Sequence, residues 1–153
     1  MSRIEKPSVL LIDDNEPTRT LMTAVLHREF DVHTAIDGSD AVEQLKTRAF
    51  AAIVLDLRMP QLDGFGVLEF LQQQSPDTLR RVLVVTAALS PHDVMRARGF
   101  GIHAILPKPF DVEALLNGVR ECAGIDGGKF SNVFCSSGPM ILLIADLLRQ
   151  RLM

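Results

Sequence analysis

The sequence predicts a doubly wound α/β domain, a three-layer sandwich in which helices cover both faces of a parallel sheet. Between residues 8 and 121, short apolar runs rich in β-branched residues alternate with longer segments of helical periodicity. Three runs, at 8–12, 51–55 and 81–85, are almost continuously apolar, as strands are when both faces of a sheet are covered. Right-handed connections between successive strands then favour a doubly wound sheet.

Local signals place the individual elements of this region. Two shorter and more polar strands are expected nearer the sheet edges, at 31–35 and 102–106. Helices are expected at 16–29, 38–48, 63–73, 91–98 and 111–121. Asn15 and Ser90 each stand just before a first turn that contains proline, which is typical of a helix start. Gly99 and Gly101 predict the end of the fourth helix.

The composition favours one domain in a reducing compartment and argues against nucleic-acid binding. The chain has 153 residues, of which 47% are hydrophobic, so it can bury one good core. A net charge of -3 and the absence of Trp and Tyr offer neither a broad cationic surface nor the usual stacking platforms. Residues 1–7 lack the apolar core of a secretory signal, and Cys122 and Cys135 lack zinc-binding spacing, so we expect free thiols in a cytoplasmic protein.

The composition changes after the fifth expected helix. We expect a domain over 8–121, a linker rich in Gly and Ser over 122–139, and an amphipathic helix or tail over 140–153. The last segment is too short to span a bilayer. It is expected to pack on its own domain or on a second copy of the chain as a homodimer, and a membrane-surface or partner-binding helix is the alternative.

Reactive side chains stand directly after four of the expected strands. Asp13 and Asp14 follow the first, Asp56 the third, Thr86 the fourth and Lys108 the fifth. A lone Asp after a strand is more often a cap or turn residue, but the carboxyl ends of parallel strands form the ligand-binding edge of such a sheet. Three carboxylates that meet there repel one another unless a cation is present.

These residue types suit phosphoryl transfer. Oxygen ligands without His or Cys favour Mg²⁺, which prefers one or two carboxylates and a phosphate. Asp56, central in strand order, is expected to be the nucleophile, and Asp13 and Asp14 to hold the metal. Thr86 can donate its hydroxyl to a phosphoryl oxygen, and Lys108 can pair with another oxygen.

Four fragments in order resemble one family. They are V-L-L-I-D-D-N at 9–15, V-L-D-L-R-M-P-Q-L-D-G at 54–64, V-V-T-A at 84–87 and P-K-P-F at 107–110. Over about 8–121 the chain resembles the receiver domains of bacterial response regulators of two-component systems, including the stand-alone chemotaxis type. The resemblance implies a flavodoxin-like fold of five βα units with strand order 2-1-3-4-5.

The resemblance also implies a function. Asp56 would accept a phosphoryl group from a phosphohistidine of a sensor histidine kinase or a histidine phosphotransfer protein, in a reaction that needs Mg²⁺. Asp13 and Asp14 would be the acidic pair, the backbone carbonyl of Arg58 would complete the metal shell, and the bond after Lys108 would be cis. Such a protein is not a turnover enzyme. It catalyses its own phosphorylation and dephosphorylation and switches the binding of a downstream protein.

The chain departs from the family pattern at several positions. Ile105 stands where the family usually carries a Tyr or Phe that rotates on activation, which puts the standard coupling from Thr86 in doubt. Arg58 and Ala88 occupy positions that resemble the family's tuners of phosphoryl lifetime. The 122–153 segment is too short and carries too few basic residues for a helix-turn-helix output domain.

Two other function classes are compatible with the same fold. A pseudo-receiver would keep the fold as an interaction module without phosphorylation; Ile105 favours it and the acidic cluster opposes it. An FMN protein or an aspartyl phosphatase is the second. The loop at Asp13 and Asp14 has no glycine-rich phosphate cradle, and Arg58 stands where such phosphatases carry a second Asp.

Overall fold

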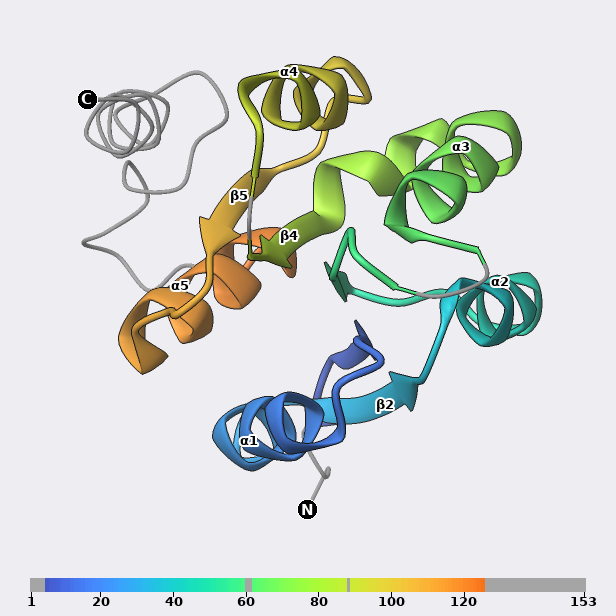
Figure 1. Ribbon diagram of the computed structural model, residues 1–153. Coiled ribbons are helices and arrows are strands. Elements are labelled where there is room, and N and C mark those ends of the chain that lie inside the picture. The colour runs from blue at the N-terminus through green and yellow to red at the C-terminus, as the bar shows by residue number, and fades with distance from the viewer. Residues whose placement is uncertain (1–4, 60–61, 88, 126–153) are drawn as a thin grey trace, which may run out of the picture.

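The computed structural model describes residues 5–59, 62–87 and 89–125 (Figure 1). Five parallel strands form one sheet in the order β2-β1-β3-β4-β5. The strands are β1 (Ser8–Ile12), β2 (Asp31–Ala35), β3 (Ala52–Leu55), β4 (Val82–Thr86) and β5 (Ala104–Pro107). The predicted doubly wound fold and its strand order are therefore confirmed.

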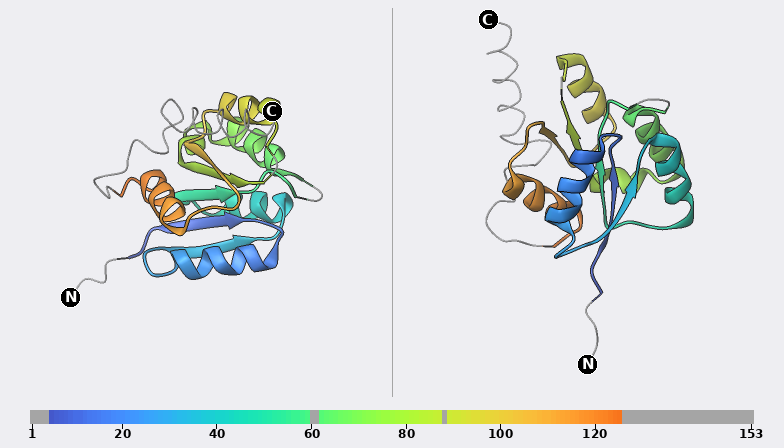
Figure 2. Two further views of the ribbon diagram at one scale, coloured as in Figure 1. Left: turned by 60° about the vertical axis from the view of Figure 1, so that its left-hand side comes forward. Right: turned by 60° about the horizontal axis from the view of Figure 1, so that its bottom comes forward.

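Helices cover both faces of this sheet. They are α1 (Glu16–Leu26), α2 (Gly38–Thr47), α3 (Gly64–Gln74), α4 (Pro91–Gly99) and α5 (Val112–Cys122). Helices α1 and α5 lie on one face and α2, α3 and α4 on the other (Figures 1 and 2). Arg120 links α5 to the end of α1. Its guanidinium donates to both carboxylate oxygens of Glu29, which lies just after α1, at 3.1 and 2.7 Å.

The core lies between the sheet and its two helical layers. Strands β1, β3 and β4 are buried almost throughout, which explains why their sequences are continuously apolar. Each Leu, Ile or Val buried there contributes about 1.5–3 kcal/mol to folding. The three central strands thus form a rigid platform whose carboxyl ends share one edge.

Most expected boundaries agree with the structure within one or two residues. The side chain of Asn15 caps α1 by accepting from the Thr18 N–H, and that of Ser90 caps α4 by accepting from the Asp93 N–H. Gly101, just after α4, has a φ of 85°, a conformation that favours glycine.

Two expected boundaries differ from the structure, and one element was not predicted. Helix α1 ends at Leu26 instead of residue 29, because the chain turns there to bury Phe30 in the core. Strand β5 begins at Ala104 instead of 102. A 3₁₀ helix, η1 (Pro76–Arg81), precedes β4 and was not expected, because a single short turn leaves no periodic apolar pattern in the sequence.

The predicted C-terminal segments are largely outside the described residues. Helix α5 extends to Cys122, the first residue of the expected linker at 122–139. The remainder of that linker beyond 125 and the helix expected at 140–153 lie outside the part that the structure describes. Among the described residues, no helix is long and apolar enough to cross a bilayer.

Candidate functional site

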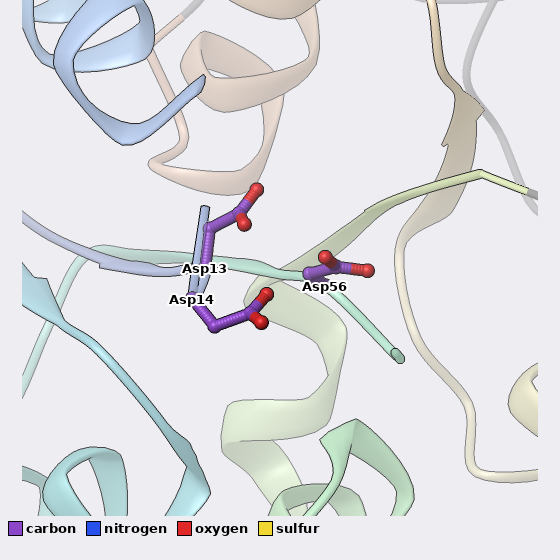
Figure 3. A group of neighbouring side chains, drawn as sticks. All are labelled: Asp13, Asp14 and Asp56. Atoms are coloured by element: carbon purple, nitrogen blue, oxygen red, sulfur yellow. The ribbon is translucent and has the colours of Figure 1, made fainter. Parts of the chain in front are cut away.

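The structure brings the predicted carboxylates together at the carboxyl edge of the sheet. Asp13 and Asp14 follow β1 and Asp56 follows β3, its neighbour in the sheet. One carboxylate oxygen from each of the three lies within 4.8 Å of the others (Figure 3). Asp13 and Asp56 are 0% and 6% exposed, whereas Asp14 faces solvent. Two buried acidic groups and one exposed acidic group therefore share a small volume.

Backbone bonds hold the first loop in place. The Asp13 N–H donates to the Ala35 carbonyl at 3.2 Å, which continues the β1–β2 ladder by one residue. The Asn15 N–H donates to Oδ1 of Asp13 at 2.9 Å, and a guanidinium N–H of Arg19 donates to the Asp13 carbonyl at 2.8 Å. Hydrogen bonds thus hold both the backbone of Asp13 and its carboxylate.

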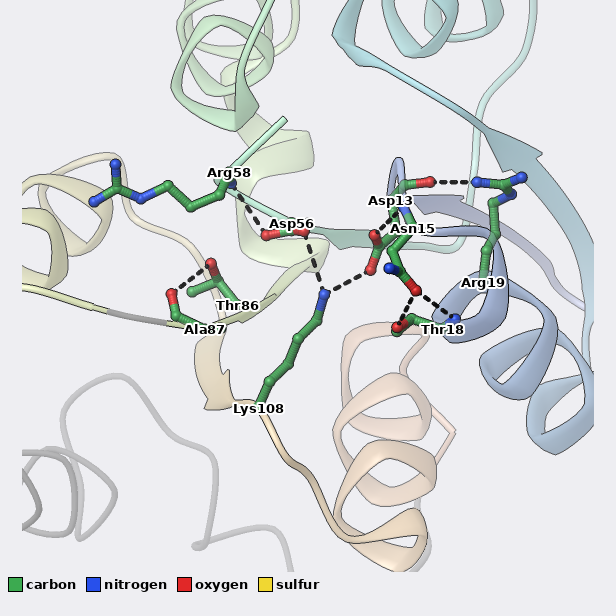
Figure 4. Close-up of polar contacts among 9 residues, drawn as sticks. All are labelled: Asp13, Asn15, Thr18, Arg19, Asp56, Arg58, Thr86, Ala87 and Lys108. Carbon is green, nitrogen blue, oxygen red and sulfur yellow. Dashed lines mark hydrogen bonds and ion pairs between the residues drawn. The ribbon is translucent and has the colours of Figure 1, made fainter. Parts of the chain in front are cut away.

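Lys108 bridges two of the carboxylates from the far end of the sequence. Its Nζ donates to Oδ2 of Asp13 at 2.8 Å and to Oδ2 of Asp56 at 3.2 Å (Figure 4). The Lys108 N–H donates to the Thr86 carbonyl at 2.9 Å, and the Lys108–Pro109 bond is cis. The lysine thus places a positive charge between two buried negative charges.

The electrostatics of the cluster favour added positive charge. Burial raises the pKa of the Asp56 carboxyl, and the nearby charge of Asp13 adds to the rise. The N–H of Arg58 and the ammonium of Lys108 counteract this rise without cancelling it. Burial lowers the pKa of Lys108, but its hydrogen bonds to Asp13 and Asp56 and their charges outweigh burial, so its pKa is raised. The environment therefore favours the charged form of Lys108 and disfavours the charged form of Asp56.

Gly64 allows α3 to start directly against the Asp56 loop. Asp63 caps this helix by accepting from the Gly66 N–H at 3.0 Å, and the Gly64 N–H donates to the Leu57 carbonyl at 3.2 Å. A Cβ at Gly64 would lie 2.5 Å from the Asp56 carbonyl oxygen, closer than van der Waals contact permits. Glycine is therefore required here for the loop and the helix to meet.

Comparison with known proteins identifies the architecture around this cluster. A model of the response regulator receiver domain matches residues 9–120. The chain belongs to this family. It is 26% identical to the response regulator ArlR of Staphylococcus aureus over 113 residues, which are 73% of this chain and 50% of ArlR. The receiver domain described here thus spans about half the length of the curated relatives it matches.

Solved structures agree with this assignment. The receiver domain of the Francisella response regulator 1452 is 26% identical, with a TM-score of 0.70 over 78% of this chain and 98% of that chain. The chemotaxis protein CheY4 of Vibrio cholerae is 28% identical, with a TM-score of 0.70 over 76% of this chain and 98% of that chain. The resemblance seen in the sequence motifs is thereby confirmed.

Thr86 and Ile105 are both buried in this receiver domain. Thr86 is 1% exposed, and its hydroxyl donates to the Ala87 carbonyl at 3.3 Å, a long bond between adjacent residues (Figure 4). Ile105 pairs with Val84 in the β4–β5 register and is 3% exposed. The aliphatic side chain thus already fills an interior position. Ala88, the second expected tuning position, lies outside the described residues.

Arg58 makes a contact that no sequence motif predicts. Its N–H donates to Oδ1 of Asp56 at 3.1 Å, while its guanidinium pairs with Oδ2 of Asp93 on α4 at 2.8 Å. The two partners are 35 residues apart, and no motif links them. The metal-ligand role expected of the Arg58 carbonyl stays a prediction.

The donor set fits a magnesium ion. Asp13, Asp14 and Asp56 offer carboxylate oxygens within reach of one centre, and no His or Cys belongs to the cluster that the described residues form. Mg²⁺ binds such hard oxygen ligands and retains several waters. Burial raises the pKa of Asp56, so a bound cation would favour the charged form of this carboxyl.

Proposed function

We propose that this receiver domain is a phosphoacceptor. In this proposal, Asp56 takes a phosphoryl group from a phosphohistidine of a sensor histidine kinase or a histidine phosphotransfer protein, with Mg²⁺ held by Asp13, Asp14, Asp56 and the Arg58 carbonyl. The supporting observation is the Lys108 ammonium, which contacts Asp13 and Asp56 at 2.8 and 3.2 Å beside the three clustered carboxylates.

The chemistry follows from the groups at the sheet edge. A carboxylate oxygen of Asp56 forms a bond to phosphorus as the bond from phosphorus to the histidine nitrogen breaks, and the imidazole leaves with the electron pair and takes up a proton. Bound Mg²⁺ would supply charge neutralisation for the transferring group. Lys108 would turn from Asp56 to a phosphoryl oxygen, since an ammonium pairs well with a dianion.

The output is a change in partner binding. The Thr86 hydroxyl, held only by a long bond to the Ala87 carbonyl, would exchange that acceptor for a phosphoryl oxygen. This exchange would shift a balance between two states of the surface formed by α4, β5 and α5.

The chain would catalyse its own phosphorylation and dephosphorylation and would not turn over a separate substrate. Cys122, a buried unpaired thiol, agrees with a reducing, cytoplasmic location.

Intact-mass measurement after incubation with acetyl phosphate and Mg²⁺ tests the proposal. We expect the mass of one phosphoryl group on the wild type and none on Asp56→Asn or when Mg²⁺ is chelated. Asp77→Asn, an exposed carboxylate in η1, is the matched control and should be modified normally. A wild type that gains no mass, or an Asp56→Asn variant that still gains it, would reject the assignment.

The competing function is a pseudo-receiver that binds partners without phosphorylation. Ile105, buried where an aromatic side chain is usual, is the feature that favours it. Calorimetry with Mg²⁺ and beryllium fluoride, a phosphoryl mimic, distinguishes the two functions. A phosphoacceptor binds the mimic only with Mg²⁺, whereas a pseudo-receiver does not bind it.

A further inference from the structure

Arg58 connects the acceptor aspartate to helix α4. Its backbone N–H donates to Asp56 at 3.1 Å, and its guanidinium donates to Oδ2 of Asp93, in the first turn of α4, at 2.8 Å. The side chain extends away from Asp56 (Figure 4). It is 65% exposed, so it has room to change direction, whereas the Asp93 side chain is 17% exposed.

Helix α4 contacts the rest of the domain through buried apolar residues and through Arg96. Val94 and Ala97 are its buried residues. One turn beyond Asp93, Arg96 pairs with Glu69 of α3 at 3.2 Å and lies 4.0 Å from the ring centroid of Phe65. The first turn of α4 is therefore joined to the Asp56 loop by the Arg58–Asp93 ion pair. One turn later, Arg96 joins α4 to α3.

A phosphoryl group on Asp56 would compete with Asp93 for the guanidinium. It adds a charge of about -1.5 to -2 near neutral pH and presents several acceptor oxygens, which a planar guanidinium can bind in a bidentate manner. Asp93 offers a single negative charge. Lys108 already contacts two carboxylates, so a second cation on the neighbouring loop would add to the neutralisation of the dianion.

We propose that Arg58 is a positioning residue with two alternative partners: it pairs with Asp93 when Asp56 is unmodified, and with the phosphoryl group when Asp56 is modified. The exchange releases the first turn of α4. This inference rests on the proposed phosphoacceptor function, and it makes the Arg58–Asp93 pair a restraint that phosphorylation removes. By linkage, breaking that pair in advance must strengthen binding of the phosphoryl group.

Titration calorimetry of beryllium fluoride in the presence of Mg²⁺ tests this exchange in four proteins: wild type, Asp93→Asn, Arg58→Gln and the double variant. Asp93→Asn should bind the mimic about two- to fivefold more tightly, the change that loss of a competing exposed ion pair allows. Arg58→Gln should bind about three- to tenfold more weakly, because it keeps the backbone N–H and carbonyl and loses only the guanidinium. In the double variant, the gain from Asp93→Asn should disappear.

Glu69→Gln is the matched control, because it breaks a different ion pair of α4, between Glu69 of α3 and Arg96, and leaves Arg58 paired with Asp93. Its affinity for the mimic should equal that of the wild type. A gain with Glu69→Gln as large as that with Asp93→Asn, or a gain with Asp93→Asn that persists without Arg58, would assign the effect to loosening of α4 and overturn the exchange.

The failure of the exchange can be told apart from failure of the phosphoacceptor function. A wild type that binds the mimic, together with an Asp93→Asn variant of unchanged affinity, overturns only the exchange. A wild type that does not bind the mimic overturns both. Amide chemical shifts of residues 93 and 94 give a second readout: addition of the mimic should move them further in the wild type than in Asp93→Asn, where the pair with Arg58 is already absent.

Discussion

Replacing Asp56 with Asn should stabilise the unmodified protein when no divalent cation is present. Two unit charges 4.8 Å apart repel by about 3 kcal/mol at an effective dielectric constant of about 20, and Asp56 has both Asp13 and Asp14 within that distance. Attraction between the Asp56 carboxylate and the Lys108 ammonium at 3.2 Å stabilises the charged form of Asp56 by about 5 kcal/mol at the same dielectric constant. Lys108 therefore offsets most of the repulsion, and burial of the Asp56 carboxylate is the largest cost of its charged form.

The exposure of Asp14 weakens one of these repulsions by solvent screening. We therefore expect Asp56→Asn to raise the free energy of unfolding by about 1–3 kcal/mol at pH 7. Asn keeps one carbonyl oxygen, which can accept from either the Arg58 N–H or Lys108, so the variant loses one of the two hydrogen bonds and this loss offsets part of the gain. Urea denaturation followed by far-ultraviolet circular dichroism measures the change, since the chain has no Trp or Tyr for fluorescence.

The gain should depend on pH with a defined sign. Burial raises the pKa of Asp56 in the folded state, so its contribution to stability is greatest at acid pH, where it is protonated, and is lost as pH rises through that raised pKa. The advantage of Asp56→Asn should thus grow as pH rises through the raised pKa of Asp56 and vanish below about pH 3.9, where an ordinary aspartate is also protonated.

Mg²⁺ and a control variant complete this test. Saturating Mg²⁺ should stabilise the wild type more than Asp56→Asn, which lacks one ligand charge, and so reduce the difference between them. Asp77→Asn should unfold like the wild type under every condition. If Asp56→Asn is less stable than the wild type at pH 7 in a chelator, or if the difference does not change with pH, the carboxylates do not repel one another as the structure indicates.

Three further outcomes are expected. Lys108→Ala removes the cation between Asp13 and Asp56, so the free energy of unfolding in a chelator should fall by about 2–4 kcal/mol, and the variant should fail to bind beryllium fluoride in calorimetry. Gly64→Ala places a Cβ 2.5 Å from the Asp56 carbonyl oxygen, so it should lower the free energy of unfolding in urea by at least about 1–3 kcal/mol. Gly99→Ala, with open space around its Cβ, should be neutral or slightly stabilising. Equal effects of the two variants would contradict the close approach at Gly64. Burial raises the pKa of the Cys122 thiol, so this thiol should react slowly in the folded protein. In a Cys135→Ser background, iodoacetamide at pH 8 should leave the mass of the folded protein unchanged and should alkylate Cys122 rapidly in urea. Fast alkylation of the folded protein would show that the thiol is accessible.

The sequence was sufficient to predict the fold and the meeting of the acidic residues. Parallel strands buried on both faces are continuously apolar, so the positions of β1, β3 and β4 can be predicted from the sequence. The residues that follow the carboxyl ends of these strands must lie at one edge of the sheet. Asp13, Asp56 and Lys108 are brought together by this topology alone. Their separate positions in the chain do not matter, because the sheet order determines which ends are neighbours.

The sequence was not sufficient where a contact depends on side-chain direction or on a single turn. The pair between Arg58 and Asp93 depends on how α4 lies against the Asp56 loop, which neither residue signals. Helix η1 is one tight segment without an apolar repeat, and the end of α1 at Leu26 depends on burial of Phe30, a tertiary effect. Local patterns identify elements, but packing determines where they stop.

Lys108, whose ammonium contacts two carboxylates of the acidic cluster, directly follows β5. Lys108 lies 95 residues after Asp13 and 52 after Asp56, and its position depends on β5 being paired along β4. A nascent or truncated chain that ends before β5 would contain every acidic group of the site without its ammonium. If the proposed phosphoacceptor function is correct, Asp56 should accept a phosphoryl group only after β5 has paired with β4.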